Sequence, residues 1–213
     1  YNMEVEDDHT YFVGEQNWGW AVWSHNTVCH ETLKGSKLLN GQPYVREVLD
    51  TIKDAATKAK SFVDGLTHSS PLTNSSRRID LYINLLKARA GVPHHQLSKE
   101  AQALIAKFTK SGGVDWNKLI SISRGSAIQA KADELLKLQP NIAKLIQDGD
   151  LLLNRGSQLG IRSARTQRLL RPDYQLKLSN DKWAVFDLTT RKEYGKIMKY
   201  NHRRTPFLIE LYH

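Results

Sequence analysis

The chain has 213 residues, of which 25% are charged and 40% hydrophobic, a composition that excludes a disordered polypeptide. No apolar run reaches the roughly 18 residues of a membrane-spanning helix, so we expect no membrane span. The formal net charge is +9, and residues 151–213 hold 13 Lys and Arg against five Asp and Glu. This concentration of positive charge favours a polyanionic partner or substrate for the C-terminal part.

Residues 1–26 have the pattern of short β-strands. The stretches "MEVED" and "TYFVGE" alternate in polarity, and "WGWAVWSHN" reads as a third, aromatic-rich strand. The sequence begins without an initiator methionine and without the basic and apolar regions of a signal peptide. We therefore expect it to be a piece of a longer protein.

The middle of the chain is predicted to be a helical region, residues 27–125. Apolar residues recur at helical spacing from Pro43 to Val63. Ser98 is the expected N-cap of a later helix, and Pro140 is expected to begin the last one before the C-terminal part. The helices predicted after the first cover residues 77–90, 98–110, 126–138 and 140–148, with Gly112, Gly113 and Gly125 between them.

The C-terminal part, residues 126–213, is predicted to be an α/β core. The stretches "QLKL" and "WAVFDLTT" read as strands around the turn "SNDK". A helix is expected at about 191–203, and "FLIELY" reads as a final strand. The order helix, strand, strand, helix, strand is typical of a layered α/β architecture.

Two carboxylates stand out in these predicted strands. Asp173 follows Pro172 directly, and Asp187 lies on a strand whose neighbours are mostly apolar. An ionised acid in such surroundings is costly unless a cation or a metal ion meets it. A hairpin would bring the two acids to one end of a sheet, where paired carboxylates favour a hard divalent cation such as Mg²⁺.

A basic stripe follows at once. Lys192, Lys196, Lys199 and Arg203 fall on one face of the predicted helix, and such a face can hold a phosphate backbone beside the two acids. A solvated helix surface is the alternative interpretation of the same pattern.

The first 26 residues resemble the end of a Hint (hedgehog/intein) domain, as found before the toxin tip of bacterial polymorphic toxins. The resemblance rests on "HTYFVG" and on the terminal pair His25-Asn26. In that family the Asn side chain attacks its own backbone carbonyl while the His polarises the bond. The resemblance implies an autoprocessing remnant at His25 and Asn26, with Thr27 beginning the released part.

The stretch "RPDYQL…WAVFDLTT…GKIMKY" resembles the PD-(D/E)xK nuclease superfamily, which has the restriction-endonuclease fold, a mixed sheet flanked by helices. The resemblance implies that Asp173 and Asp187 bind the metal. The family's lysine two residues after the second acid would fall at Thr189, so this sequence departs from the pattern. Because many members move that lysine to the next helix, Lys196 is the first choice and Lys192 the second.

Further residues of the implied site are less sharply marked. The segment from Lys196 to Tyr200 resembles the family's helical QxxxY element, with Lys in place of Gln. Nucleic-acid-binding residues are expected at Lys199, Arg203, Arg171 and Arg168. In the family a further acid often comes from the helix before the first strand, and the candidates here are Glu134, Asp148 and Asp150.

Together the resemblances imply a polymorphic toxin tip of the contact-dependent inhibition or Rhs type. The expected activity is hydrolysis of phosphodiester bonds in DNA, or in RNA including tRNA, with DNA slightly favoured. The expected cofactor is Mg²⁺, or another divalent cation such as Mn²⁺ or Zn²⁺. Such a toxin is delivered from the cell surface or by secretion, acts in the target-cell cytoplasm and has a cognate, acidic immunity protein. A non-hydrolytic nucleic-acid-binding toxin and an ADP-ribosylating toxin remain as alternatives.

Overall fold

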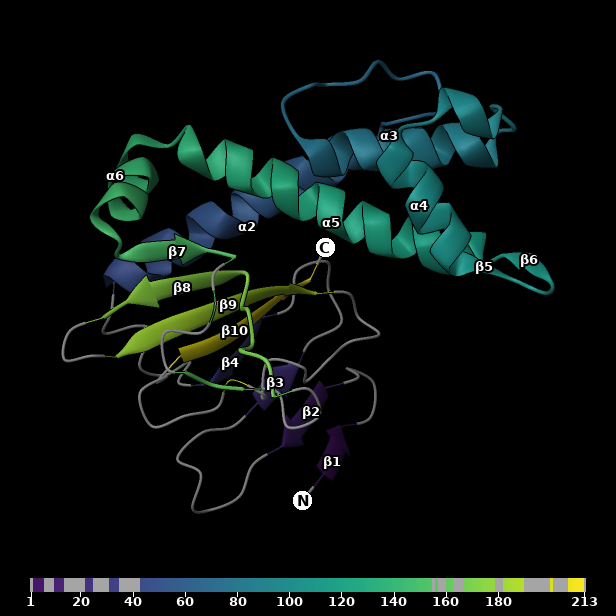
Figure 1. The fold of residues 1–213 in the computed structure, drawn as a ribbon. Helices are drawn as coiled ribbons and strands as arrows, with labels where there is room; N and C mark the ends of the chain where they lie inside the picture. Colours follow the sequence, from purple (N-terminus) through teal and green to yellow (C-terminus); the bar gives the residue numbers. More distant parts are fainter. Residues whose placement is uncertain are drawn as a thin grey trace. The chain divides into compact units, whose positions relative to one another are not determined.

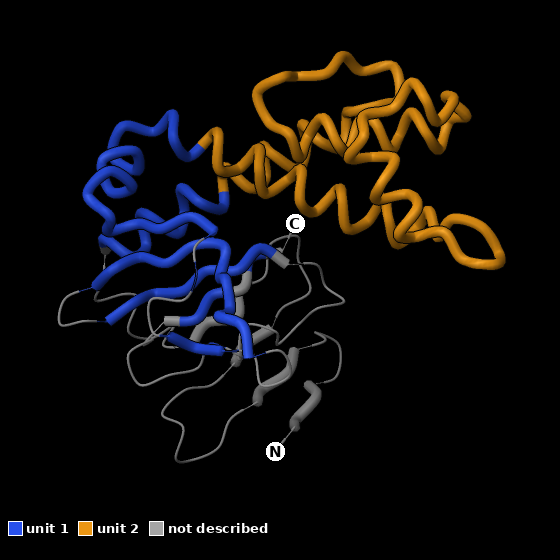
Figure 2. The backbone as a smooth tube through the Cα atoms, viewed as in Figure 1, with its two compact units in different colours: residues 1–53, 136–213 blue, residues 54–135 orange. Residues whose placement is uncertain are grey.

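The fold combines helices with mixed and antiparallel sheets, which confirms the predicted α/β class (Figure 1). It divides into two compact units, residues 1–53 with 136–213, and residues 54–135 (Figure 2). The computed structural model describes residues 2–5, 10–13, 22–24, 31–34, 43–154, 156, 160–162, 167–178, 182–189, 200 and 207–212.

The three strands predicted near the N-terminus form a sheet of their own. They are β1 (Asn2–Val5), β2 (Thr10–Val13) and β3 (Val22–Ser24), paired antiparallel in the order β1-β2-β3. His25 and Asn26 follow β3 in the sequence and lie outside the described residues.

A five-stranded sheet with the order β4-β10-β9-β8-β7 forms the centre of the first unit (Figure 1). Its β10 pairs parallel with β9, and every other neighbouring pair is antiparallel. The predicted strands "QLKL", "WAVFDLTT" and "FLIELY" correspond to β8, β9 and β10, whereas β4 comes from the range that the sequence assigns to the helical region. The bounds are β4 Glu31–Lys34, β7 Leu151–Leu153, β8 Tyr174–Lys177, β9 Trp183–Thr189 and β10 Phe207–Tyr212.

The two faces of this sheet differ in chemistry, because successive side chains on a strand alternate between faces. One face is apolar and buried, with Tyr174, Leu176, Ala184, Phe186, Ile209 and Leu211. On the other face Val185 and Leu208 form a buried cluster with Tyr200, against which Ile161 and Leu170 pack. This second face also carries the buried polar residues Gln175 and Asp187.

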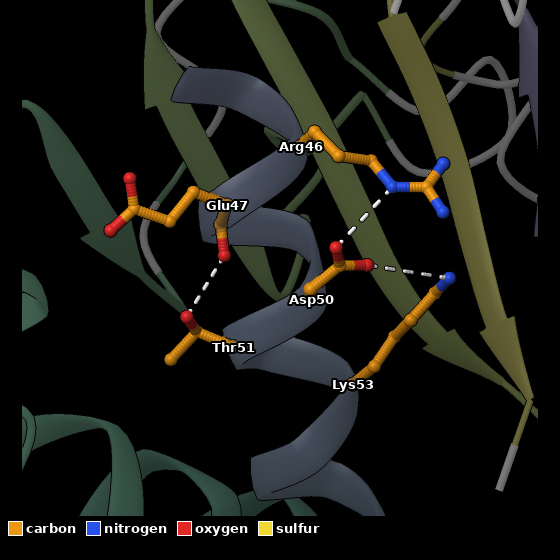
Figure 3. A network of polar contacts seen from close by, with 5 residues as sticks. All are labelled: Arg46, Glu47, Asp50, Thr51 and Lys53. Atoms are coloured by element: carbon orange, nitrogen blue, oxygen red, sulfur yellow. Dashed lines mark hydrogen bonds and ion pairs between the residues drawn. The ribbon is translucent and has the colours of Figure 1, made fainter. Parts of the chain in front are cut away.

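Helix α2 (Pro43–Asp64) is amphipathic from its first turn. In the part that belongs to the first unit, Val45, Val48, Leu49 and Ile52 are buried, at the spacing of one helical face. Figure 3 shows the polar side of the same turns, where Asp50 lies between Arg46 and Lys53, with nitrogen–oxygen distances of 3.3 and 4.0 Å. The hydroxyl of Thr51 donates to the carbonyl of Glu47 there (Figure 3).

Helix α6 (Pro140–Asp148) contacts β7, which it precedes in the chain. Pro140 occupies the first turn, as predicted, and Gly149 ends the helix in the left-handed conformation that glycine adopts without strain. The Asn141 side-chain amide donates to the Glu47 carboxylate of α2 at 3.0 Å. These contacts tie both helices to the first unit.

The second unit is helical, with α3 (Arg77–Arg89), α4 (Lys99–Phe108) and most of α5 (Trp116–Lys137). The predicted N-cap is confirmed, since the Ser98 hydroxyl accepts the Ala101 N–H at 3.2 Å. The unit also contains the end of α2 from Asp54, a short 3-10 helix (His94–Gln96) and a hairpin of β5 (Thr109–Lys110) and β6 (Gly113–Val114). One cluster of its core consists of Leu85, Leu97, Ala101, Ile105 and Leu119.

The prediction that a helix begins near residue 126 is wrong, because α5 begins ten residues earlier, at Trp116. Asp115 supplies the missing start signal, since its carboxylate accepts the Lys118 N–H at 3.2 Å. Gly125 therefore lies inside the helix. A glycine there costs only about 1 kcal/mol relative to alanine, and the burial of Leu119 and Ile128 on either side outweighs that cost.

Candidate active site

The candidate site lies where β8 and β9 meet. The ladder between these strands pairs Tyr174 with Phe186 and Gln175 with Val185. If this antiparallel register is continued by one residue before Tyr174, it places Asp173 opposite Asp187. Side chains directly opposite each other on neighbouring strands share a face, with Cβ atoms about 5 Å apart.

Two reciprocal hydrogen bonds hold the acids in this arrangement. The backbone N–H of Asp173 donates to Oδ1 of Asp187 at 3.1 Å, and the backbone N–H of Leu188 donates to Oδ2 of Asp173 at 2.7 Å. Asp187 is only 8% exposed, and Asp173 is half-buried. Each carboxylate therefore accepts a hydrogen bond from the other segment's backbone, which fixes Asp173, just before β8, beside Asp187 of β9.

Tyr200 completes the apolar side of the site. It is 1% exposed and packs with Val185 and Leu208. Burial raises the pKa of its hydroxyl above the ordinary range, and the negative charges of Asp187 and Asp173 raise it further. The phenol is thus a neutral group beside both carboxylates.

Gln175 is a polar residue of the site that the sequence analysis missed. It lies on β8 two residues after Asp173, on the same face, and is 1% exposed. Its side-chain amide donates to the carbonyl of Gly156 at 3.4 Å. The signal available in the sequence was its position, because a polar residue at i+2 from a buried acid shares the face of that acid.

The backbone of Asp173 is anchored on its other side by β7. The N–H of Asn154, which directly follows β7, donates to the carbonyl of Asp173 at 2.8 Å. Asn154 adopts a positive φ of 50°, a conformation that Asn tolerates better than most residues. The start of β8 is therefore held from both neighbouring strands.

The two acids carry like charges, which repel each other. Two unit charges about 5 Å apart repel by about 3 kcal/mol at an effective dielectric constant of about 20. A hydrogen bond to a charged group contributes about 1.5–3 kcal/mol, so the two backbone bonds offset part of this repulsion. The donor set of Asp173 and Asp187 consists of carboxylate oxygens, which fits a hard divalent cation such as Mg²⁺. Within the described part of the chain, no group of three or more His, Cys, Asp or Glu side chains assembles as a metal site.

The predicted basic residues divide into those the structure describes and those it does not. Arg168 and Arg171 are exposed in the segment that leads into β8, and Arg171 precedes Asp173 by two residues. This segment is folded back on itself, with the Leu170 N–H donating to the Ile161 carbonyl at 2.9 Å. The predicted residues outside the described part are Lys192, Lys196, Lys199 and Arg203.

The three candidates for a further acid are each bound to a lysine. Glu134 pairs with Lys131 at 2.9 Å in the second unit, and Asp148 pairs with Lys144 at 2.8 Å on α6. Asp150 lies 3.7 Å from the ammonium of Lys177, at the opposite end of β8 from Asp173.

Comparison with protein-family models, curated proteins and solved structures found no match to this chain. The sequence predicts no membrane span, and none of the helices in the described ranges is long and apolar enough to cross a bilayer.

Proposed function

We propose that this chain is a metal-dependent endonuclease that hydrolyses phosphodiester bonds, with DNA slightly favoured over RNA, and that it serves as the toxic tip of a bacterial competition protein. The observation that carries the proposal is the pair of opposed, reciprocally hydrogen-bonded carboxylates, Asp173 and Asp187. A like-charged pair of which Asp187 is buried and Asp173 half-buried fits a cation that the two acids share.

Each residue of the site has a role in this proposal. Asp173 and Asp187 hold the divalent cation, which when bound activates water and stabilises charge on the phosphate. Lys196, or Lys192 in its place, positions the water or stabilises the developing negative charge, as the family resemblance implies. Tyr200 and its apolar neighbours shield the buried side of the acids from solvent.

The charge of the C-terminal part supports a polyanionic substrate. Arg168 and Arg171 are exposed just before Asp173, and Lys199 and Arg203 add two further cations in the sequence. Such a basic surface binds the phosphate backbone without regard to sequence. It is also the surface that an acidic immunity protein would cover.

The test is incubation of the full chain with plasmid DNA and with total RNA, with Mg²⁺ and with EDTA. We expect cleavage of at least one polymer that depends on the metal. Asp187→Asn should lower the cleavage rate about a hundredfold or more, because it removes a charged ligand of the cation. The matched control is Asp50→Asn on the exposed side of α2, which should cleave like the parent.

Three results would contradict the proposal. If the folded chain cuts neither polymer and remains toxic, the protein is not a nuclease. If Asp187→Ala retains both nucleic-acid binding and toxicity, the protein acts by binding alone. Consumption of NAD in place of nucleic-acid cleavage would identify an ADP-ribosylating toxin.

A further inference from the structure

The connection between β7 and β8, residues 154–172, has a one-sided charge. It contains no lysine, aspartate or glutamate. Its charged residues are the arginines Arg155, Arg162, Arg165, Arg168 and Arg171. Arg162, Arg168 and Arg171 belong to the described residues, where all three are exposed and none forms an ion pair with a described carboxylate. The described part of this connection therefore presents positive charge alone.

This part of the connection folds into a hairpin with two antiparallel arms. Arg162 of the first arm and Leu169 of the second pair as an antiparallel bridge. The Leu170 N–H donates to the Ile161 carbonyl at 2.9 Å. The guanidinium of Arg162 donates through Nη1 to the carbonyl of Gln167 at 2.8 Å. These bonds fix the two arms to each other.

The hairpin is held on the face of the sheet that carries the candidate site. Ile161 and Leu170, one from each arm, pack against the buried cluster on that face. The Gly156 carbonyl, earlier in the connection, accepts a hydrogen bond from the Gln175 side chain at 3.4 Å. Gly156 also lies against Leu169, since a β-carbon at position 156 would be 3.5 Å from its Cδ1. The hairpin is therefore a fixed element on the face of the two acids.

The same packing directs the arginines outward. Neighbouring residues of an extended arm point to opposite sides. Arg162 follows Ile161, and Arg171 follows Leu170, so each partly buried apolar residue is next to an exposed arginine. Arg168 is exposed in the second arm. The hairpin thus rests on the sheet through its apolar residues and presents its arginines to a ligand.

The choice of arginine indicates which anion the hairpin fits. A guanidinium presents its N–H donors in a planar fork that binds two phosphate oxygens at once, whereas a lysine acts as a point charge. The bond from Arg162 to Gln167 uses one of these donors and leaves the others for a ligand. It also holds the guanidinium in place, which lowers the entropic cost of binding. Solubility alone requires no preference for arginine, so the composition favours phosphate groups.

We propose that this hairpin is a clamp for the phosphate backbone of a nucleic acid, with Arg162, Arg168 and Arg171 as its phosphate-binding residues. The inference rests on the proposed function for the kind of polyanion. It adds Arg162 and a fixed element to the two arginines assigned above. Because Arg171 lies two residues before Asp173, the clamp holds the backbone beside the acids. Contacts to phosphate carry no sequence information, so binding should be independent of base sequence.

The test is binding of the full chain to labelled DNA and RNA duplexes of equal length over a range of NaCl concentrations. EDTA is present throughout, so that metal-dependent cleavage does not occur. Arg162→Gln, Arg168→Gln and Arg171→Gln should each weaken binding about fivefold to tenfold near 0.1 M salt. Each should also make the slope of log K against log salt concentration shallower by about 0.9, the value for one lost phosphate contact.

The matched control is Lys182→Gln. Lys182 is exposed just before β9, at the opposite end of that strand from Asp187. Its replacement removes one positive charge from the same unit but leaves the hairpin intact. We therefore expect the affinity and the salt slope of Lys182→Gln to equal those of the parent. A loss as large as that of the hairpin variants would show that net charge, rather than the clamp, determines binding.

Arg162 also closes the hairpin, and a second replacement separates that role from phosphate binding. Arg162→Lys keeps the positive charge but loses the planar guanidinium. If Arg162 binds phosphate, the lysine variant should retain the salt slope of the parent, whereas Arg162→Gln should not. Equal slopes in the two variants, together with equally lowered melting temperatures, would show that Arg162 only closes the hairpin.

The outcomes separate the clamp from the function on which it rests. If the parent cleaves nucleic acid while the triple glutamine variant binds it with an unchanged slope, the clamp proposal fails and the nuclease proposal stands. If the parent cleaves neither polymer but loses binding on these replacements, the nuclease proposal fails and the clamp stands. Poly-L-glutamate serves as a polyanion without phosphate. Equal affinity of the parent for poly-L-glutamate and for the duplexes would overturn the clamp in favour of an acidic protein partner.

Discussion

The side chain of Asp187 carries two opposing contributions to stability. Its Oδ1 accepts the Asp173 N–H at 3.1 Å, and its charge faces that of Asp173 across the ladder. Replacement by Asn keeps an oxygen acceptor but removes the charge. Replacement by Ala removes both and leaves a part-buried N–H without this acceptor.

We therefore predict different stabilities for the two variants in EDTA. Asp187→Asn should have a free energy of unfolding equal to that of the parent or higher by up to about 1 kcal/mol. Asp187→Ala should lose about 1–3 kcal/mol, the cost of an unsatisfied buried donor. Urea unfolding followed by circular dichroism measures both values. A large loss in Asp187→Asn would show that the carboxylate is a structural group rather than a cation ligand.

Local pattern in the sequence was sufficient for most of the elements. The helical spacing from Val45 to Val63 and the alternation in "WAVFDLTT" each reflect which side chains face a core, and α2 and β9 have close to their predicted bounds. The start of α5 was missed because Gly125 was taken as a helix boundary. The side-chain cap of Asp115 instead begins the helix at Trp116, and Gly125 lies inside it.

Of the candidate site, only the contacts between residues close together in the sequence could be predicted. Asp173 and Asp187 are joined by a short hairpin, so their proximity follows from the strand pattern and the turn between them. Gln175 could have been inferred from its place two residues after Asp173, whereas Tyr200 depends on which segments pack together across longer separations in the chain. That information lies in the sheet register and the buried cluster, which no local pattern encodes.

At the level of the helices, one polar contact links the end of α2 to α5. Arg124 lies 2.6 Å from the carboxylate of Asp64, which also pairs with Lys60 at 2.8 Å. Partial burial alone raises the pKa of the Asp64 carboxyl, but the hydrogen bonds from Lys60 and Arg124 outweigh it and hold the pKa below its ordinary value. The ionised form is therefore favoured in the folded protein.

This low pKa predicts a pH-dependent contribution to stability. It should be fully present above pH ~4, the ordinary value for Asp, and should disappear as the pH falls through the lower pKa of the folded state. At pH 7 we expect Asp64→Asn to lower the free energy of unfolding by about 0.5–1 kcal/mol, a small value because the group is partly exposed. Urea unfolding at pH 7 and pH 3 measures the difference between the variant and the parent.

The control for this prediction lies on the same helix. Asp54 pairs with Lys58 one turn later, at 2.7 Å, and both side chains are well exposed. Asp54→Asn should therefore cost less than Asp64→Asn. A pH-independent difference between Asp64→Asn and the parent would contradict the electrostatic explanation.

At the scale of the whole molecule, the first unit is built from two segments that are far apart in the sequence. The first unit consists of residues 1–53 and 136–213. Residues 54–135, which come between these two segments in the sequence, form the second unit (Figure 2). Within the first unit the chain leaves the N-terminal sheet after Ser24 and enters the five-stranded sheet at Glu31. The pair His25-Asn26 falls in this interval of the sequence.

The change of sheet predicts where the chain tolerates truncation. Removal of residues 1–26 leaves all five strands of the central sheet, whereas removal of residues 1–42 also takes β4 and leaves β10 as an edge strand. We expect the chain 27–213 to keep the parent's metal response and a melting temperature within a few degrees of it. The chain 43–213 should melt lower and aggregate, because the unpaired edge of β10 is free to pair with other chains.

Thermal unfolding and light scattering of both truncated chains measure this difference. The comparison bears on the site as well, since Leu208 of β10 packs with Val185 and Tyr200 on the face that carries Asp187. If β4 fixes the position of β10, the chain 43–213 should also require more cation than 27–213 for the same rise in melting temperature. Equal stability of the two truncated chains would mean that β4 is dispensable. Loss of stability already in 27–213 would mean that the N-terminal sheet supports the five-stranded sheet, and would place the boundary of the folded unit before β1 rather than between β3 and β4.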